Sequence, residues 1–303
     1  MRVAAIDCGT NSIRLLIADI QGDRLTDVDR RMEVVRLGEG VDRTGRLAAA
    51  ALDRTFSACR RYAERIQETG AERVRFVATS ASRDASNAAD FVRGVEGILG
   101  ATPEVVPGVV EADLSFIGAV RSLAELPLPA LVVDIGGGST EFVLGAQHAE
   151  QSASVDIGCV RMTERHGRSD PPADGELAGM RRDIDAHIGR AAQSVDFSAA
   201  RCLVGLAGTV TTMAAIAHQL PAYDPARIHG SVMTAEQVHA IAGRLAGLSR
   251  EERLAMPVMH PGRADVIPAG AMILDRIVAA TGVSEVVVSE HDILDGIAWS
   301  LQD

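Results

Sequence analysis

The chain has 303 residues, of which 47% are hydrophobic and 23% are charged, and its formal net charge is −11 at pH 7. This composition is typical of a folded globular protein and excludes a largely disordered chain. The acidic balance argues against a sequence-independent nucleic-acid binder. Because all 30 basic residues are arginine, a Walker-type P-loop and a pyridoxal Schiff base are also excluded.

The first part of the chain alternates strands and helices. Hydrophobic patterning predicts strands within residues 3–6, 13–20, 27–37, 74–78 and 104–106, and helices within 46–67, 88–99 and 111–123. Polar turns are expected at 7–12 and 79–83. Pro127 and Pro129 then interrupt the pattern, so we expect two domains, residues 1–126 and 127–303.

After this break the pattern restarts. It predicts strands at 131–133, 142–144, 203–206 and 286–288, and helices within 209–217, 235–245, 264–280 and 293–301. A shift of 127 residues places Asp7 on Asp134 and Gly9 on Gly136, each in a strand, polar turn and strand. The sequence therefore predicts an internal duplication within an α/β fold.

The two duplicated turns suit phosphate binding. Glycine lets the backbone approach a ligand, successive N–H groups form an anion site, and serine and threonine hydroxyls add donors. An aspartate there could hold Mg²⁺, although Asp7 and Asp134 could also simply cap their turns. A third glycine-bearing turn, residues 205–209, precedes a predicted helix and suits phosphate or a nucleotide, unless its small residues only allow tight packing.

These three turns carry a family resemblance. They are similar to the phosphate and adenosine motifs of the actin/Hsp70/sugar-kinase superfamily, and within it the chain resembles the exopolyphosphatase/guanosine-pentaphosphate phosphohydrolase family. The resemblance extends from residue 3 to about residue 300, and its further motifs are Pro107–Ala112, Gly158–Glu164, Arg263–Gly270 and Asp295–Gly296.

The resemblance implies an α/β fold of two actin-like (ribonuclease H-like) domains with an interdomain cleft. It also implies Mg²⁺-dependent hydrolysis of a terminal phosphoanhydride, with Mn²⁺ as an alternative metal. Glu111 would activate the attacking water, and Asp134 and Glu141 would orient this water and, with Asp7, bind the metal. The implied phosphate-binding residues are Thr10, Asn11, Ser12, Arg14, Ser80, Arg83, Gly136, Gly137, Gly138, Ser139, Thr140, Gly208 and Thr209.

The sequence departs from the family pattern in two respects. Val109 and Val110 stand where many members carry acids before the glutamate, which leaves less like-charge repulsion to raise the pKa of Glu111. Longer relatives also have a C-terminal helical domain, whereas this chain stops after its last predicted helix. We therefore expect weak processivity and a preference for short polyphosphate chains.

Several functional alternatives stay open at this point. The substrate could be inorganic polyphosphate or guanosine pentaphosphate, the reaction could be phosphotransfer to ADP, or the protein could be a non-catalytic phosphate sensor. Glu111 could be only an acid favoured at a helix start. The resemblance allows a homodimer, and we expect no membrane span. Four cysteines without zinc spacing favour a cytoplasmic protein.

Overall fold

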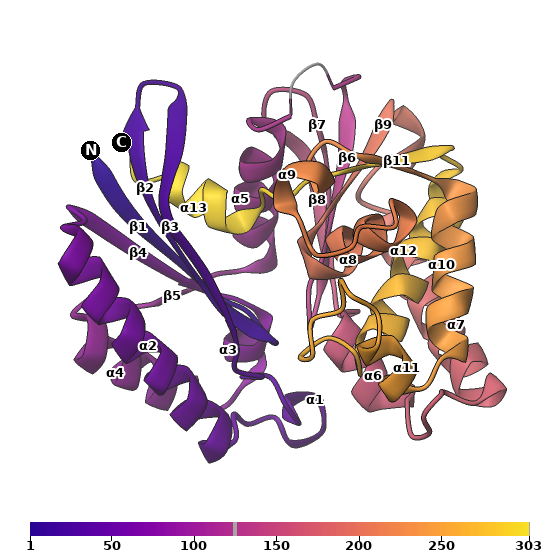
Figure 1. Ribbon diagram of the computed structural model, residues 1–303, viewed down its shortest axis with the longest axis horizontal. Helices are drawn as coiled ribbons and strands as arrows, with labels where there is room; N and C mark the ends of the chain where they lie inside the picture. Colours follow the sequence, from indigo (N-terminus) through magenta and orange to yellow (C-terminus); the bar gives the residue numbers. More distant parts are fainter. Residues whose placement is uncertain (124–125, 303) are drawn as a thin grey trace. The chain divides into compact units, whose positions relative to one another are not determined.

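The computed structural model describes residues 1–123 and 126–302 and comprises two compact units. Unit 1 contains Met1–Gly118 together with the C-terminal residues from Ile293, and unit 2 contains Ala119–Asp292 (Figure 1). The predicted division into residues 1–126 and 127–303 placed the last helix in the second domain. The structure differs from it, because this helix belongs to unit 1.

Unit 1 is a five-stranded sheet covered by helices. Its strands are β1 (Arg2–Cys8), β2 (Ser12–Gln21), β3 (Arg24–Val34), β4 (Arg73–Ala78) and β5 (Glu104–Val105), in the order β3-β2-β1-β4-β5. The central strand β1 runs antiparallel to β2 and parallel to β4. The helices are α1 (Val41–Thr44), α2 (Ala49–Thr69), α3 (Ser80–Asp84), α4 (Ala88–Leu99), α5 (Gly108–Val120) and α13 (Ile293–Trp299).

Strand β1 faces two different cores. Its alternate side chains point to opposite sides of the sheet because a strand repeats every two residues. Ile6 packs in one core with Tyr62 of α2 and Phe91 of α4, whereas Val3 packs in the other with Ile297 of α13. The sheet is therefore buried on both faces, with α2 and α4 on one side and α5 and α13 on the other (Figure 1).

Close packing of α13 explains why the chain end belongs to unit 1. A Cβ atom on Gly296 would lie only 2.0 Å from the carbonyl oxygen of Leu114 in α5, so glycine permits the two helices to approach. The neighbouring Asp295 is 1% exposed and forms an ion pair with Arg30 of β3 at 2.5 Å. These contacts join residues far apart in the sequence.

Unit 2 repeats the architecture of unit 1. Its strands are β6 (Ala130–Ile135), β7 (Thr140–Gly145), β8 (Ala149–Val155), β9 (Cys202–Leu206), β10 (Val232–Thr234) and β11 (Glu285–Val288), in the order β10-β11-β9-β6-β7-β8. The order β8-β7-β6-β9-β11 matches β3-β2-β1-β4-β5, and β10 is an addition at the edge. This match confirms the predicted internal duplication.

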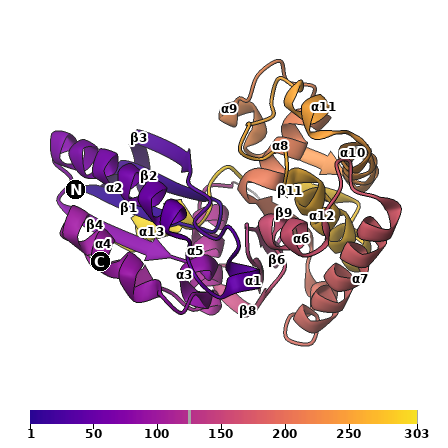
Figure 2. The ribbon, with the colours of Figure 1, turned by 90° about the horizontal axis from the view of Figure 1, so that it is seen from below.

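The helices of unit 2 bury one large core and a small separate cluster of Cys159, Val160 and Val266. They are α6 (Cys159–His166), α7 (Asp174–Ala191), α8 (Ala207–Ala217), α9 (Pro225–Ile228), α10 (Ala235–Gly247), α11 (Arg250–Leu254) and α12 (Ile267–Thr281). Helix α12 packs against α7, α8 and α10 (Figure 2). Among the described residues, no helix is both long and apolar enough to cross a membrane.

Several elements were not predicted from the sequence. The polar segment 79–83 contains the short helix α3, and β8, α6, α7 and β10 were all missed. Helix α7 did carry a signal, because Met180, Ile184 and Ile188 recur at helical spacing and are buried.

Candidate active site

The predicted site residues of each unit lie where parallel strands end. In unit 1 most of them lie at or just after the ends of β1, β4 and β5, and in unit 2 at or just after the ends of β6 and β9. The others, Ser12, Arg14, Thr140 and Glu141, lie at the starts of the antiparallel strands β2 and β7. The carboxyl ends of parallel strands are the usual place for ligands in α/β sheets.

The first turn is closed by an ion pair. Asp7, near the end of β1, lies directly opposite Arg14 of β2 and is 4% exposed. Both Nη2 and Nε of Arg14 donate hydrogen bonds to Oδ2 of Asp7, at 2.6 and 3.0 Å. A carboxylate already neutralised by a guanidinium is a weaker cation ligand. The ion pair thus gives both residues a structural contact within the turn, and the metal and phosphate roles predicted for them stay predictions.

Two predicted phosphate-binding hydroxyls do come together in unit 1. The Oγ1 atom of Thr10 and the Oγ atom of Ser80 lie 2.8 Å apart, and both residues are buried. The backbone around Thr10 is fixed by Gly38, whose N–H donates to the Thr10 carbonyl at 2.9 Å. A Cβ on Gly38 would lie 2.3 Å from Cγ2 of Thr10, so this glycine, which the sequence reasoning missed, makes room for the threonine.

Glu111 and Arg83, two further predicted site residues of unit 1, also form an ion pair. Nη1 of Arg83 lies 3.1 Å from Oε2 of Glu111 and also donates to the Val106 carbonyl at 3.0 Å. Glu111 is buried in the first turn of α5. The pair orients the carboxylate and places a permanent cation beside it, which is the combination required to position a water molecule near an anionic group.

The second turn, in unit 2, has acids where the first has an ion pair. Asp134 of β6 and Glu141 of β7 lie directly opposite each other, and they are 7% and 1% exposed. Opposite residues in an antiparallel pair project to the same face, with Cβ atoms about 4.5–5.5 Å apart. Oε1 of Glu141 accepts a hydrogen bond from Ser154 of β8 at 2.7 Å. Two buried carboxylates side by side repel each other, and a divalent cation would relieve this repulsion.

This acidic pair fits Mg²⁺ better than a metal that needs a full protein cage. Mg²⁺ is commonly held by one or two carboxylates and completes its octahedron with waters and substrate oxygens. Within the part of the chain that the structure describes, no group of three or more His, Cys, Asp or Glu residues is arranged to hold a metal.

Helix α6 holds the carbonyl oxygens of the second turn. The backbone N–H groups of residues 159–161 donate to the carbonyls of Gly136 and Gly137 at 2.9–3.0 Å, and Nε of Arg161 donates to that of Gly138 at 2.7 Å. In a trans peptide the N–H points opposite to the preceding carbonyl. The amides of residues 137–139 therefore point away from α6, which is an arrangement suited to an anion.

A glycine makes this arrangement possible. A Cβ atom on Gly158, the residue before α6, would lie 2.4 Å from the carbonyl carbon and oxygen of Gly137. The segment Gly158–Glu164, one of the motifs that carry the family resemblance, therefore braces the second turn.

The third turn is closely packed against α12 and Arg263. Thr209 is buried, and a Cβ on Gly270 of α12 would lie 2.3 Å from its hydroxyl. Arg263 covers Gly208, since a Cβ there would lie 2.1 Å from Cζ of the guanidinium, and its Nη1 donates to the Gly208 carbonyl at 3.2 Å. Arg263 is therefore an additional candidate site residue at the third turn. It was not predicted as one from the sequence, although it begins the motif Arg263–Gly270.

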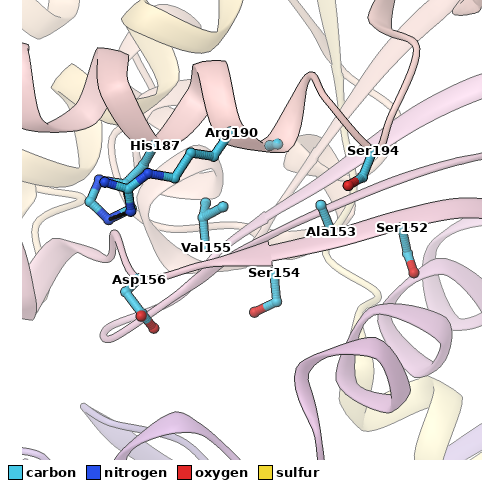
Figure 3. Close-up of a pocket in the computed structure, with 9 residues that line it drawn as sticks. Ser152, Ala153, Ser154, Val155, Asp156, His187, Arg190 and Ser194 are labelled. Atoms are coloured by element: carbon cyan, nitrogen blue, oxygen red, sulfur yellow. Dashed lines mark hydrogen bonds between the residues drawn. The ribbon is translucent and has the colours of Figure 1, made fainter.

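A polar cavity of about 320 Å³ lies between β8 and α7 in unit 2. Figure 3 shows His187 and Arg190 extending from α7, and Ser152 and Ser154 projecting from β8. No residue predicted for the site lines this cavity. One of its lining residues, Ser154, donates a hydrogen bond to Glu141 of the acidic pair.

Two units that repeat one sheet order, each with a glycine turn between its first two strands, define an actin-like two-domain protein. Residues 16–302 match the model of the Ppx/GppA phosphatase family. The chain belongs to this family and is an enzyme of that class.

Relatives with full coverage agree with this assignment. The chain is 49% identical to Exopolyphosphatase 2 of Mycobacterium tuberculosis, over 99% of this chain and 98% of the relative. A crystal structure of an exopolyphosphatase-like protein superimposes with a TM-score of 0.97 at 42% identity, covering 99% of this chain and 97% of that one. The Ppx/GppA family member of Aquifex aeolicus gives a TM-score of 0.82 at 32% identity, covering 100% and 98%.

Proposed function

We propose that the protein is an exopolyphosphatase, which removes the terminal phosphate of inorganic polyphosphate with the help of Mg²⁺ or Mn²⁺. The observation that carries the proposal is the second turn, where three backbone amides that face away from α6 adjoin a buried pair of carboxylates. The names of the full-length relatives support the same activity.

Residues of unit 2 would bind the charged phosphate chain. The amides of residues 137–139 would donate to phosphate oxygens, and Asp134 and Glu141 would hold the metal ion. When bound, the metal would supply neutralisation of charge on the phosphoanhydride oxygens. We assign the metal to these two acids rather than to Asp7, because Arg14 already neutralises Asp7.

Residues of unit 1 would carry out the proton transfer. Glu111 would orient a water molecule and accept its proton as the water oxygen attacks the terminal phosphorus. The bridging P–O bond breaks, and the products are orthophosphate and a chain shorter by one unit. Arg83 would stabilise charge on the terminal phosphate while holding Glu111 through the 3.1 Å contact.

The two valines before Glu111 differ in their surroundings. Val109 is 54% exposed, whereas Val110 packs against the core that contains α13. Acids at these positions would have added negative charge near the carboxylate of Glu111. The proposed enzyme would prefer short polyphosphate chains.

We also propose a cytoplasmic location, which the four free thiols support.

The test compares four substrates. Phosphate release is measured with short polyphosphate, long polyphosphate, guanosine pentaphosphate and ATP, each with Mg²⁺, Mn²⁺ or a chelator. We expect metal-dependent release from short polyphosphate to be fastest. Faster release from the pentaphosphate would move the protein to the alarmone substrate, and ATP formation from polyphosphate and ADP would indicate a phosphotransferase. Binding without turnover on all four would indicate a sensor.

Glu111→Gln tests the proposed base within the same assay. The amide keeps the size and hydrogen bonding of the side chain but cannot accept a proton, so we expect phosphate release to fall by roughly 100- to 10,000-fold. Glu64→Gln, on the exposed surface of α2, is the matched control and should leave the rate unchanged. A Glu111→Gln enzyme with near-normal turnover would refute the assigned role.

A further inference from the structure

A single hydroxyl group joins the edge strand of the second sheet to the acidic pair. Glu141 of β7 lies opposite Asp134 of β6 on one side and opposite Ser154 of β8 on the other. Both strand pairs are antiparallel, so the three side chains project to one face of the sheet and form a row across neighbouring strands. The row therefore consists of two acids followed by a hydrogen-bond donor, whose Oγ donates to Oε1 of Glu141 at 2.7 Å.

The strand register keeps Ser154 in this row. The pairing of β7 with β8 is regular from Thr140 to Leu144, and its shift falls between Leu144 and Gly145. Ser152, two residues before Ser154, therefore projects to the same side of β8 (Figure 3). Ser152 lies opposite Val143, so the two serines differ in whether an acid lies across from them.

The two partners of the hydrogen bond differ in burial. Glu141 is 1% exposed, whereas Ser154 is exposed on the strand that ends the sheet. A buried carboxylate requires hydrogen-bond donors to compensate for lost hydration, and Ser154 supplies one. A hydroxyl that donates to an ionised carboxylate at 2.7 Å forms a stronger hydrogen bond than two neutral groups do. The contact is therefore suited to fixing the side chain of Glu141.

Fixing this side chain matters because the last torsion angle of a glutamate is soft. The carboxylate rotates about χ3 with only broad preferences, and the neighbouring carboxylate of Asp134 repels it when no cation lies between them. Mg²⁺ demands nearly ideal octahedral geometry from its ligands. Hydrogen bonds that orient a ligating carboxylate therefore contribute to metal affinity, although the donor itself does not touch the metal.

We propose that Ser154 is a positioning residue for the metal ion, because its hydroxyl holds the carboxylate of Glu141 in the orientation that binds Mg²⁺. The inference rests on the proposed function, in which Asp134 and Glu141 hold the metal. A purely structural Ser154 would satisfy a buried acceptor and affect stability alone. The two roles therefore give different results when metal binding itself is measured.

The test measures Mn²⁺ binding without any substrate. Electron paramagnetic resonance follows free Mn²⁺ as the ion is titrated into the purified protein and its variants. Ser154→Ala removes the hydroxyl, and we expect Mn²⁺ to bind roughly 10- to 100-fold more weakly. Ser154→Thr keeps a hydroxyl and should bind within about twofold of the unaltered protein. An equal loss in both variants would contradict the role of the hydroxyl.

Ser152→Ala is the matched control, because it removes a hydroxyl from the same face of the same strand. Its affinity for Mn²⁺ should be unchanged. Urea denaturation without metal shows that each variant is folded, which we expect because Ser154 is exposed. A Ser154→Ala protein that is less stable in urea but binds Mn²⁺ as tightly as the unaltered protein would overturn the inference.

Glu141→Gln separates this inference from the metal assignment on which it rests. If Glu141→Gln weakens Mn²⁺ binding and Ser154→Ala does not, the metal assignment is supported and the inference alone fails. If Glu141→Gln binds Mn²⁺ as tightly as the unaltered protein, the metal assignment fails and the inference fails with it. Weaker binding in both variants, with normal binding in Ser152→Ala and Ser154→Thr, is the result that we expect.

Discussion

The two duplicated turns share a backbone and differ in charge. In the first, the Gly9 N–H donates to the Ser12 carbonyl, and in the second the Gly136 N–H donates to the Ser139 carbonyl, each at 3.0 Å. At the same register position, the acid of the first turn faces Arg14, whereas that of the second faces another acid. The two turns therefore share one hydrogen-bonding pattern and differ in charge at one position, which is Arg14 in the first turn and Glu141 in the second. Arg14 neutralises the aspartate of the first turn, whereas the two acids of the second turn suit a cation.

The turns are also braced in different ways. The first is held from a loop, where the N–H groups of Val35 and Arg36 donate to the Asn11 carbonyl at 3.1 and 2.8 Å. The second is held by the start of α6, which takes up the carbonyls of three successive glycines. In the second turn the amides of residues 137–139 face away from this support and adjoin two acids, which is why the phosphate and metal functions are proposed there.

The largest expected effect distinguishes the equivalent positions 14 and 141. Glu141→Gln removes one of the two carboxylates assigned to the metal, and we expect phosphate release to fall by roughly 1,000-fold. Arg14→Gln changes the corresponding position of the first turn and should reduce the rate less than about tenfold. Both rates are measured at saturating Mg²⁺. A larger loss for Arg14→Gln would reverse the comparison.

A smaller loss of activity is expected from disturbing the second brace. In Gly158→Ala the new methyl group meets the Gly137 backbone, so the turn must shift and its amides lose their alignment. We expect phosphate release to fall by up to about 100-fold. Gly189→Ala, in α7 with nothing within 4 Å of the added Cβ, serves as the control and should retain full activity. Equal rates for the two variants would show that the brace does not position the turn.

Stability should respond in opposite ways at the two aspartates. Asp7→Asn breaks a largely buried ion pair, and we expect the free energy of unfolding to fall by about 1.5–3 kcal/mol. Asp134→Asn removes a charge facing Glu141, so without Mg²⁺ it should be neutral or stabilising. Urea denaturation of both variants, with and without Mg²⁺, checks this contrast. Stabilisation of Asp134→Asn by Mg²⁺ to the same extent as the unaltered protein would contradict the metal assignment.

The smallest expected effect is a loss of stability at acidic pH. Asp183 of α7 lies 2.9 Å from both Arg165 and His166 at the end of α6. Burial raises the pKa of Asp183, but these hydrogen bonds and charges outweigh it, so this pKa lies below its usual value. Such a group contributes stability above the unfolded pKa of about 3.9, and the contribution is lost as pH falls through the lower folded pKa.

Acidification should therefore loosen α6 before it affects the loop that braces the first turn. Amide hydrogen exchange of α6, compared with that of residues 35–38 at about pH 5 and about pH 3, measures this difference. Asp183→Asn should show the loosened α6 at both values. Identical protection of α6 in the two proteins at the higher pH would refute the role of Asp183.

The sequence by itself determined a large part of this protein. The strand, glycine turn and strand pattern predicted both duplicated hairpins. The motifs also led to the family. These features are local, because the alternation of a strand and the residues of a turn are set by chain neighbours within a few positions.

Tertiary structure alone decided how distant segments complete each site. The return of α13 to unit 1 depends on Gly296 meeting Leu114, and the fixed direction of the glycine amides depends on Gly158. Contacts between residues far apart in the chain leave no periodic pattern in the sequence. They form only when the folded helices and strands pack closely against each other.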